Sequence, residues 1–255
     1  MTSLSSQHHP PSVTTAQHHM FVVELVGLAG VGKTTLTTAL LAAAPTVLGS
    51  WQLRQQLPLS QLNLAWHALM LTFYFMPTYL RHWPRHRWFT ATEMRSLCYL
   101  AAWPRALAER KGQDVVQLMD LGPIFRLVFL TEFGTSLTQS DQFNAWRHRQ
   151  ITQWRELINV IIMLDAPDEV LQERIDGREK AHVAKAQSIT QNLAFYQRYR
   201  AGYQEVIANL CRSQENGRAP MLLHFDTSQS SVDEIVTELL KTLKICTLDL
   251  IQEKS

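Results

Sequence analysis

The amino-acid sequence predicts a doubly wound α/β domain, in which helices cover both faces of a parallel β-sheet. Strand-length apolar segments recur at residues 21–26, 115–120, 159–165 and 221–226. Helix-like segments separate them, and these connections are long enough for the crossovers that parallel strands require. A glycine-rich string of the phosphate-binding type directly follows the first apolar segment.

The composition is that of one large globular domain. Apolar residues make up 46% of the 255 residues and charged residues 18%, against about 25% in average proteins. A disordered chain, a collagen-like chain and a charge-rich coiled coil are thereby excluded. The net charge of +2 does not require nucleic acid as a partner, and we predict none. Cys98, Cys211 and Cys246 lie far apart without CxxC spacing, which predicts neither a disulfide framework nor a zinc site and fits a cytoplasmic protein.

Both ends of the chain are expected to lie outside the folded domain at 20–246. Residues 1–19 contain no Lys or Arg and no apolar run, so they are interpreted as a solvated tail rather than a signal peptide. Residues 247–255 are interpreted as a C-terminal tail.

The first predicted strand, residues 21–26, leads into a complete phosphate-loop motif. Residues 27–34 read GLAGVGKT, and a Leu- and Ala-rich helix follows over 35–44. Glycines let backbone N–H groups converge on phosphate oxygens, and a helix N-terminus adds a positive dipole. Lys33 is expected to reach the β- and γ-phosphates, and the Thr34 hydroxyl to bind magnesium. The predicted nucleotide-binding residues are Gly27, Gly30, Val31, Gly32, Lys33, Thr34 and Thr35.

A phosphate loop alone serves several protein classes. The Asn-Lys-x-Asp string that reads guanine in GTPases does not occur, nor does the Leu-Ser-Gly-Gly-Gln string of transporter ATPases. These two absences argue against a GTPase and against a transporter ATPase. The later segments of the sequence must therefore decide between the remaining classes.

The second strand, 115–120, ends in Asp120. A carboxylate at the carboxyl end of a parallel strand, beside a phosphate loop, can hold magnesium or accept a proton from an attacking hydroxyl. We therefore predict Asp120 as a catalytic and metal-binding residue. The alternative is that Asp120 only opens the Leu121-Gly122-Pro123 turn.

The third strand, 159–165, precedes a helix with two arginines. Arg174 and Arg178 are four residues apart and share a helix face. Two guanidiniums there can clamp a transferring phosphoryl group, so both are predicted catalytic residues of a lid at 173–188. Acidic residues are interleaved with them, so an ordinary solvated helix remains the alternative. The fourth strand, 221–226, is followed by an amphipathic helix over 232–243.

These segments resemble the nucleoside and nucleotide kinases of the phosphate-loop class, with thymidylate kinase the nearest familiar member. Residues 164–178, which read LDAPDEVLQERIDGR, are similar to that family's strand, turn and arginine-bearing lid. Residues 195–207 resemble the helix after the lid, and 225–236 the last strand and helix. The resemblance implies a five-stranded sheet of order 2-3-1-4-5, with a short second strand near 46–48. It also implies Mg2+-dependent phosphoryl transfer from ATP to a small acceptor, with a nucleoside or nucleotide favoured.

Two departures from the family pattern leave the acceptor open. Leu121 stands where thymidylate kinases carry an arginine, and their characteristic string after the second strand is not recognisable at 45–53. An ATP-binding regulatory or membrane-associated protein, with slow hydrolysis and no transfer, is therefore the alternative function.

The predicted helical acceptor region, 50–112, contains an unusually apolar segment. No charged residue occurs between Arg54 and Arg81, and the 64–80 stretch approaches the length of a membrane span. A buried helix is the favoured interpretation; membrane contact through 62–88 is not favoured, and a homodimer is left open. A later helix within 131–157 is expected to bury its tryptophans and expose its arginines. These residues are Trp146, Trp154, Arg147, Arg149 and Arg155.

Overall fold

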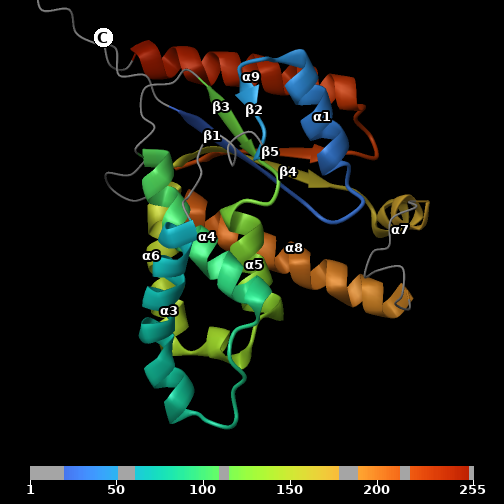
Figure 1. Ribbon diagram of the computed structural model, residues 1–255. Helices are drawn as coiled ribbons and strands as arrows, with labels where there is room; N and C mark the ends of the chain where they lie inside the picture. Colours follow the sequence, from blue (N-terminus) through green and yellow to red (C-terminus); the bar gives the residue numbers. More distant parts are fainter. Residues whose placement is uncertain (1–19, 51–60, 109–114, 178–188, 213–218, 253–255) are drawn as a thin grey trace, which may run out of the picture.

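The computed structural model describes residues 20–50, 61–108, 115–177, 189–212 and 219–252 (Figure 1). Its centre is a five-stranded sheet of order β2-β3-β1-β4-β5, in which every neighbouring pair is parallel. This is the order that the family resemblance implied. The strands are β1 (Phe21–Val26), β2 (Val47–Leu48), β3 (Val116–Met119), β4 (Ile158–Asp165) and β5 (Met221–Asp226).

Helices cover both faces of the sheet, as the sequence predicts (Figure 1). One face carries α1 (Lys33–Ala43) and α9 (Val232–Gln252). A thicker helical layer on the other face contains α3 (Gln61–Arg81), α4 (Ala91–Ala108), α5 (Pro123–Phe133), α6 (Asp141–Arg155) and α8 (Ile189–Cys211), with a short 3₁₀ helix at Ser136–Gln139. The short helix α7 (Asp168–Asp176) lies beyond the carboxyl edge of the sheet.

Strand β1 is the middle strand, and all six of its residues are buried. Its register against β4 shifts between Val22, which faces Ile158, and Val23, which faces Val160. Asn159 is the extra residue at this irregularity, and its Oδ1 accepts a hydrogen bond from the Val22 N–H at 2.8 Å. A side chain thus satisfies a backbone donor where the ladder is interrupted.

The helical layer is held together by aromatic side chains. Phe75 of α3 contacts the rings of Phe89, Phe143 and Trp146. Trp154 is fully buried, and its Nε1 donates to the Leu100 carbonyl at 3.1 Å. The prediction that both α6 tryptophans belong to the core is therefore confirmed.

The prediction of exposed arginines on α6 is wrong for Arg155. Its side chain is buried, and its Nε donates to the Leu210 carbonyl of α8 at 3.0 Å. A second donation from Arg155 Nη2 reaches the Asn209 carbonyl. The guanidinium binds carbonyls near the end of α8, where backbone acceptors lack helical partners and favour positive charge.

The buried-helix interpretation of the apolar segment holds for one face of α3 only. Leu71 and Phe75 are buried, whereas several large apolar side chains elsewhere on the helix are exposed. Within the described part of the chain, none of the helices combines the length and the apolarity that crossing a membrane requires.

The last helix is longer than predicted. α9 continues to Gln252, past Leu243 and into the segment expected as a C-terminal tail. No Gly or Pro interrupts residues 232–252, so no helix-stop signal separates the two parts. The predicted N-terminal tail, 1–19, lies outside the described residues.

Candidate functional site

The phosphate loop joins the end of β1 to the start of α1. Gly27, Gly30 and Gly32 have φ values of +146°, +89° and +93°, which side chains rarely adopt. A Cβ on Gly27 would lie 2.4 Å from the Leu164 carbonyl oxygen of β4, so the loop also packs too closely for any larger residue there. Backbone conformation therefore favours glycine at all three positions, and packing also excludes a side chain at Gly27 and Gly30.

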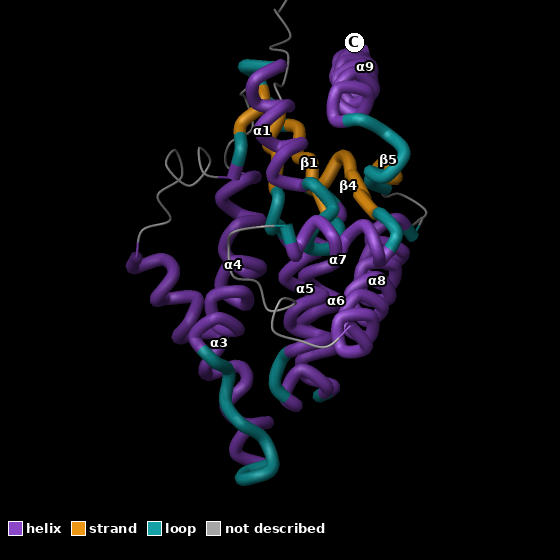
Figure 2. Tube along the Cα trace, turned by 90° about the vertical axis from the view of Figure 1, so that its right-hand side faces the viewer, coloured by secondary structure: helices purple, strands orange, loops and turns teal. Residues whose placement is uncertain are grey.

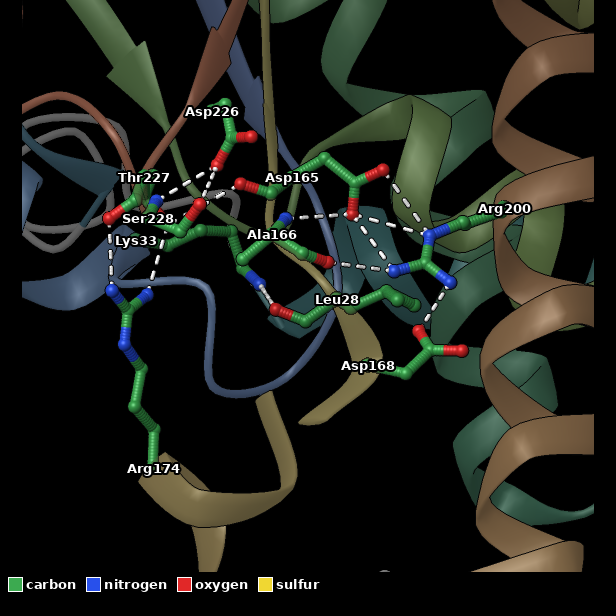
Figure 3. Close-up of polar contacts among 10 residues, drawn as sticks. All are labelled: Leu28, Lys33, Asp165, Ala166, Asp168, Arg174, Arg200, Asp226, Thr227 and Ser228. Atoms are coloured by element: carbon green, nitrogen blue, oxygen red, sulfur yellow. Dashed lines mark hydrogen bonds and ion pairs between the residues drawn. The ribbon is translucent and has the colours of Figure 1, made fainter. Parts of the chain in front are cut away.

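Lys33 lies across this loop. Its Nζ donates to the carbonyl oxygen of Gly27 at 2.7 Å. It also donates to the carbonyl oxygen of Leu28 at 2.8 Å (Figure 3). Thr34 and Thr35 follow in the first turn of α1 and are exposed. The first turn contains no acidic residue. An ammonium group and a helix N-terminus thus combine into a site for an anion.

A cavity of about 380 Å³ adjoins the loop. Its walls come from the phosphate loop, the start of α1, the end of α7 and the connection between β5 and α9. They combine apolar side chains with one guanidinium and several hydroxyls. The lining residues are Gly30, Val31, Gly32, Thr35, Leu36, Leu164, Arg174, Gly177, Thr227, Ser230, Val232 and Ile235.

Arg174 connects two walls of this cavity. Its guanidinium donates to Thr227 Oγ1 at 2.9 Å and to the Thr227 carbonyl oxygen at 2.8 Å (Figure 3). Thr227 in turn donates its N–H to the Asp165 carbonyl at 2.9 Å. Helix α7 is thereby attached to the connection after β5. Arg178 and most of the predicted lid, beyond Gly177, lie outside the described residues.

The turn between β4 and α7 is held by an ion-pair cluster that the sequence analysis did not identify. Arg200 of α8 binds both carboxylate oxygens of Asp165 at 3.1–3.2 Å and the Asp168 carboxylate at 2.5 Å. Burial alone would lower the pKa of Arg200, but these two carboxylates outweigh burial and raise it. One guanidinium thus bridges two carboxylates and also donates to the Ala166 carbonyl at 2.9 Å, so we assign this cluster the structural role of fixing the turn.

Asp120 follows β3, at the same edge of the sheet as the phosphate loop. Its Oδ1 accepts a hydrogen bond from Ser50 Oγ at 3.2 Å. The backbone N–H of Asp120 donates to that Ser50 Oγ at 3.4 Å. Ser50 was not singled out in the sequence because it lies 70 residues away. The hydroxyl orients the carboxylate predicted to hold magnesium or accept a proton. Leu121, at the position of the family's arginine, is exposed.

Glu24, which interrupts the apolar run of β1, caps the N-terminus of α5. Its Oε1 accepts from the N–H groups of Ile124 at 2.8 Å and Phe125 at 3.3 Å. A Cβ on Gly122 would lie 2.7 Å from the Glu24 carboxyl carbon. Burial raises the pKa of Glu24 to about 8, despite the two N–H donors and the nearby Arg126 charge. This carboxyl group is therefore mostly protonated at neutral pH.

The described residues contain no group of three His, Cys, Asp or Glu side chains that could hold a metal by themselves. The Thr34 hydroxyl and the Asp120 carboxylate are hard oxygen donors. Magnesium commonly takes only one or two protein ligands and completes its shell with waters and phosphate oxygens. The donor set predicted for Mg2+ therefore fits an ion that arrives with a nucleotide.

No protein-family model and no curated protein sequence matches the chain. Among solved structures, thymidylate kinase from Candida albicans has a TM-score of 0.52 and 13% identity, covering 93% of this chain and 95% of that one. Deoxyadenosine kinase from M. mycoides has a TM-score of 0.47 and 11% identity, covering 89% and 100%. Shikimate kinase from Bacteroides thetaiotaomicron has a TM-score of 0.45 and 12% identity, covering 88% and 99%. The likeness to the thymidylate kinase and the strand order show that this chain has the fold of the phosphate-loop nucleoside and nucleotide kinases.

Proposed function

We propose that the protein is a kinase that transfers the γ-phosphoryl group of ATP to a small acceptor, with nucleosides and nucleotides the expected acceptor class. The observation that carries this proposal is the phosphate loop with Lys33 lying across it, next to a cavity bounded by Arg174. The fold supports the same class of reaction, because its carboxyl edge is where doubly wound sheets bind ligands.

The donor nucleotide is expected to occupy the loop and the cavity together. Its β- and γ-phosphates would accept hydrogen bonds from the loop N–H groups and from Lys33. Its base and ribose would extend into the cavity, between Leu36, Val232 and the Arg174 guanidinium. A guanidinium can stack on a planar ring while it keeps its hydrogen bonds to Thr227.

Asp120 is expected to act on the acceptor side of the transferred group. Its carboxylate, oriented by Ser50, would accept the proton of an attacking hydroxyl or help to hold magnesium. Magnesium bound with the nucleotide neutralises charge on the phosphate oxygens, and Thr34 and Asp120 are the residues that would hold it. Phosphoryl transfer depends mainly on positioning and electrostatic stabilisation, which these fixed groups supply.

The test is a screen of nucleosides, nucleotides and other small alcohols with purified protein and Mg·ATP. The expected result is ADP formation that depends on one acceptor class, with label from [γ-³²P]ATP recovered on that acceptor. Lys33→Ala serves as the inactive control. Slow ADP release that no acceptor accelerates, with ATP still bound, would contradict the proposal and favour a nucleotide-binding regulatory protein.

A further inference from the structure

The end of α3 and the turn that follows it, residues 80–88, form one extremity of the molecule, which we call the tip. Figures 1 and 2 both place the tip at the end of the helical layer farthest from α9, away from the phosphate loop. Its sequence, LRHWPRHRW, contains three arginines, two histidines and two tryptophans but no acidic residue. None of these residues lines the cavity beside the phosphate loop, so the tip is separate from the nucleotide site.

Two large apolar side chains of the tip are exposed to solvent. Leu80 is 62% exposed and Trp83 is 63% exposed. They lie one turn apart, since the Trp83 N–H donates to the Leu80 carbonyl at 3.3 Å. Arg81 and Arg85, which alternate with them along the chain, are exposed as well. Single exposed apolar residues are ordinary, but a pair of them among guanidiniums combines two kinds of attraction on one small surface.

Packed aromatic rings hold Trp83 in this exposed position. Its ring contacts Tyr79, with 5.3 Å between the centroids, and Tyr79 contacts Trp88 at 5.1 Å. Trp88 in turn contacts Phe89, which is buried and contacts the ring of Phe75. The exposed indole is thus the end of a chain of rings that begins in the core. A side chain fixed in this way loses little conformational entropy when it binds a partner.

The three arginines of the tip differ in their partners. Arg87 forms an ion pair of 2.7 Å with the buried Glu93 of α4, so its charge is compensated within the protein. Arg81 and Arg85 form no ion pair with any acidic residue that the structure describes. Two guanidiniums are therefore available to an external anion.

The surroundings of the tip leave it positively charged. The sequence contains no Asp or Glu between Arg54 and Glu93. The start of α6 adjoins α3 and brings one carboxylate, that of Asp141, to this end of the layer. One carboxylate does not balance the two available guanidiniums. The electrostatic potential of the tip is therefore positive, which favours an anionic partner.

This combination of groups fits the surface of a membrane that contains anionic lipids. Tryptophan is favoured at the level of the lipid headgroups, where its ring meets apolar chains and its N–H meets polar groups. Arginines near an anionic leaflet are attracted to its surface charge. A nucleic acid would satisfy the guanidiniums but not Leu80, because its backbone is charged and its bases stack on aromatic rings.

We propose that the tip docks the protein on an anionic membrane surface, with Leu80 and Trp83 at headgroup level and Arg81 and Arg85 against lipid anions. The sequence alone did not favour membrane contact through 62–88. The observed exposure of Leu80 and Trp83 now supports such contact for the last part of that range.

Docking of this kind is reversible, because stable anchoring requires more apolar area or a denser basic cluster. The phosphate loop lies away from the tip, so it stays accessible to soluble ligands when the tip is docked. The proposal does not depend on the reaction that the protein catalyses.

The first test is co-sedimentation of the full chain with phosphatidylcholine vesicles that contain or lack phosphatidylserine. We expect binding to the anionic vesicles only, and loss of binding at high salt, because salt screens the attraction. Arg85→Gln should weaken binding about fivefold, and the double variant Arg81→Gln/Arg85→Gln about 30-fold. Arg212→Gln is the matched control and should bind as the wild type does. Arg212 is exposed just after α8, at the other end of the layer, where α6 ends.

A second test separates the tip from other exposed apolar surface. Trp83→Ala should weaken vesicle binding about tenfold, since a large apolar side chain is removed from the contact. Trp66→Ala removes the same kind of side chain, 58% exposed near the start of α3, and should leave binding unchanged. Thermal melting would establish that each variant is folded. If Trp83→Ala does not fold, the two arginine variants still decide the question, because both arginines are exposed.

A wild type that shows no salt-sensitive binding to the anionic vesicles would overturn the proposal. Vesicle binding that the double arginine variant retains, or that Trp66→Ala weakens as much as Trp83→Ala, would contradict it equally. Single-stranded DNA is the competing probe. Binding of DNA through Arg81 and Arg85, without binding to vesicles, would assign the tip to nucleic acid and not to a membrane.

Discussion

The phosphate-loop edge and the helical layer around α3 are built on different principles. At the edge, function follows from short strings whose glycines have positive φ and whose lysine lies across the loop. In the layer, α3 places apolar residues on two opposite faces, and only packing decides which face is buried. Local conformation determines the first region, whereas contacts between distant segments determine the second.

Two buried glutamates, one in each region, cap neighbouring helices and differ in their partners. Glu93 of α4 accepts two hydrogen bonds of 2.7 Å from Arg87 and one of 2.6 Å from the Thr90 N–H. Burial would raise its pKa, but these donors outweigh burial and lower the pKa to about 2. Glu24, at the edge, has two backbone donors, and burial raises its pKa to about 8. The partners of a buried carboxyl group, and not burial alone, decide its charge.

The largest expected effect lies at the edge. Lys33→Ala should reduce the rate of phosphoryl transfer by about 10³-fold, because the ammonium stabilises charge on the transferred group. Thermal stability should change little, since Lys33 is not part of the core. Steady-state rates and thermal melting would be measured together, with exposed Lys241→Ala of α9 as the control. Wild-type turnover in a folded Lys33→Ala variant would remove the basis for the assigned site.

A second variant tests the layer. Glu93→Gln should destabilise the fold by about 1–3 kcal/mol at pH 7, because charged hydrogen bonds to Arg87 and Thr90 are lost. The lowered pKa means that the stabilisation by Glu93 is present above about pH 4.5 and is lost as the pH falls toward 2. Urea unfolding at pH 7 and pH 3 should therefore separate the two proteins at pH 7 more than at pH 3. An equal difference at both pH values would argue against an ionised Glu93.

Arg174→Ala sharpens the description of the edge. The sequence alone suggested a clamp on the phosphoryl group, whereas the contacts attach Arg174 to Thr227 at the cavity wall. We expect ATP affinity to fall about tenfold, or about 1.4 kcal/mol, with a smaller change in kcat. Thr227→Val keeps the carbonyl acceptor and should have a weaker effect. A large loss of kcat at unchanged ATP affinity would support the clamp.

The smallest effect at mid pH is expected for Glu24→Gln. Because the pKa of Glu24 is raised to about 8, its protonated form stabilises the fold below about pH 4.5, and this contribution is lost as the pH rises toward 8. The glutamine keeps the acceptor for α5 but does not ionise. The variant should therefore resemble the wild type near pH 5 and lose less stability at pH 9. Parallel stability profiles from pH 5 to 9 would contradict a raised pKa.

Much of the fold was readable in the sequence because its signals are local. The predicted strand at 21–26 coincides with β1, and the predicted strand at 159–165 is β4 apart from one residue. Apolar runs of this length bounded by turn residues allow few other structures. The strand order came from the family resemblance and not from any local pattern. The end of α9 was misjudged because its sequence contains no stop signal near Leu243.

The sequence predicted the parts of the site that lie within one short motif, such as the phosphate loop, but not the contacts between distant residues. Ser50 and Asp120 are 70 residues apart, and Glu24 and Ile124 are 100 apart, so neither pair leaves a mark on nearby sequence. The burial of Arg155 could not be predicted either, because a charged residue on an amphipathic helix is normally exposed. Its partner, the Leu210 carbonyl, lies 55 residues away in the sequence.

By itself, the sequence determined the phosphate loop, the buried strands and the alternation of strands and helices. Glycine conformations, side-chain alternation and turn residues act within a few neighbours along the chain. Tertiary structure alone decided which face of α3 is covered, which donors surround Glu24, and that Arg174 binds Thr227. These outcomes depend on segments that meet only after the chain has folded, because burial and hydrogen bonding are properties of the assembled neighbourhood.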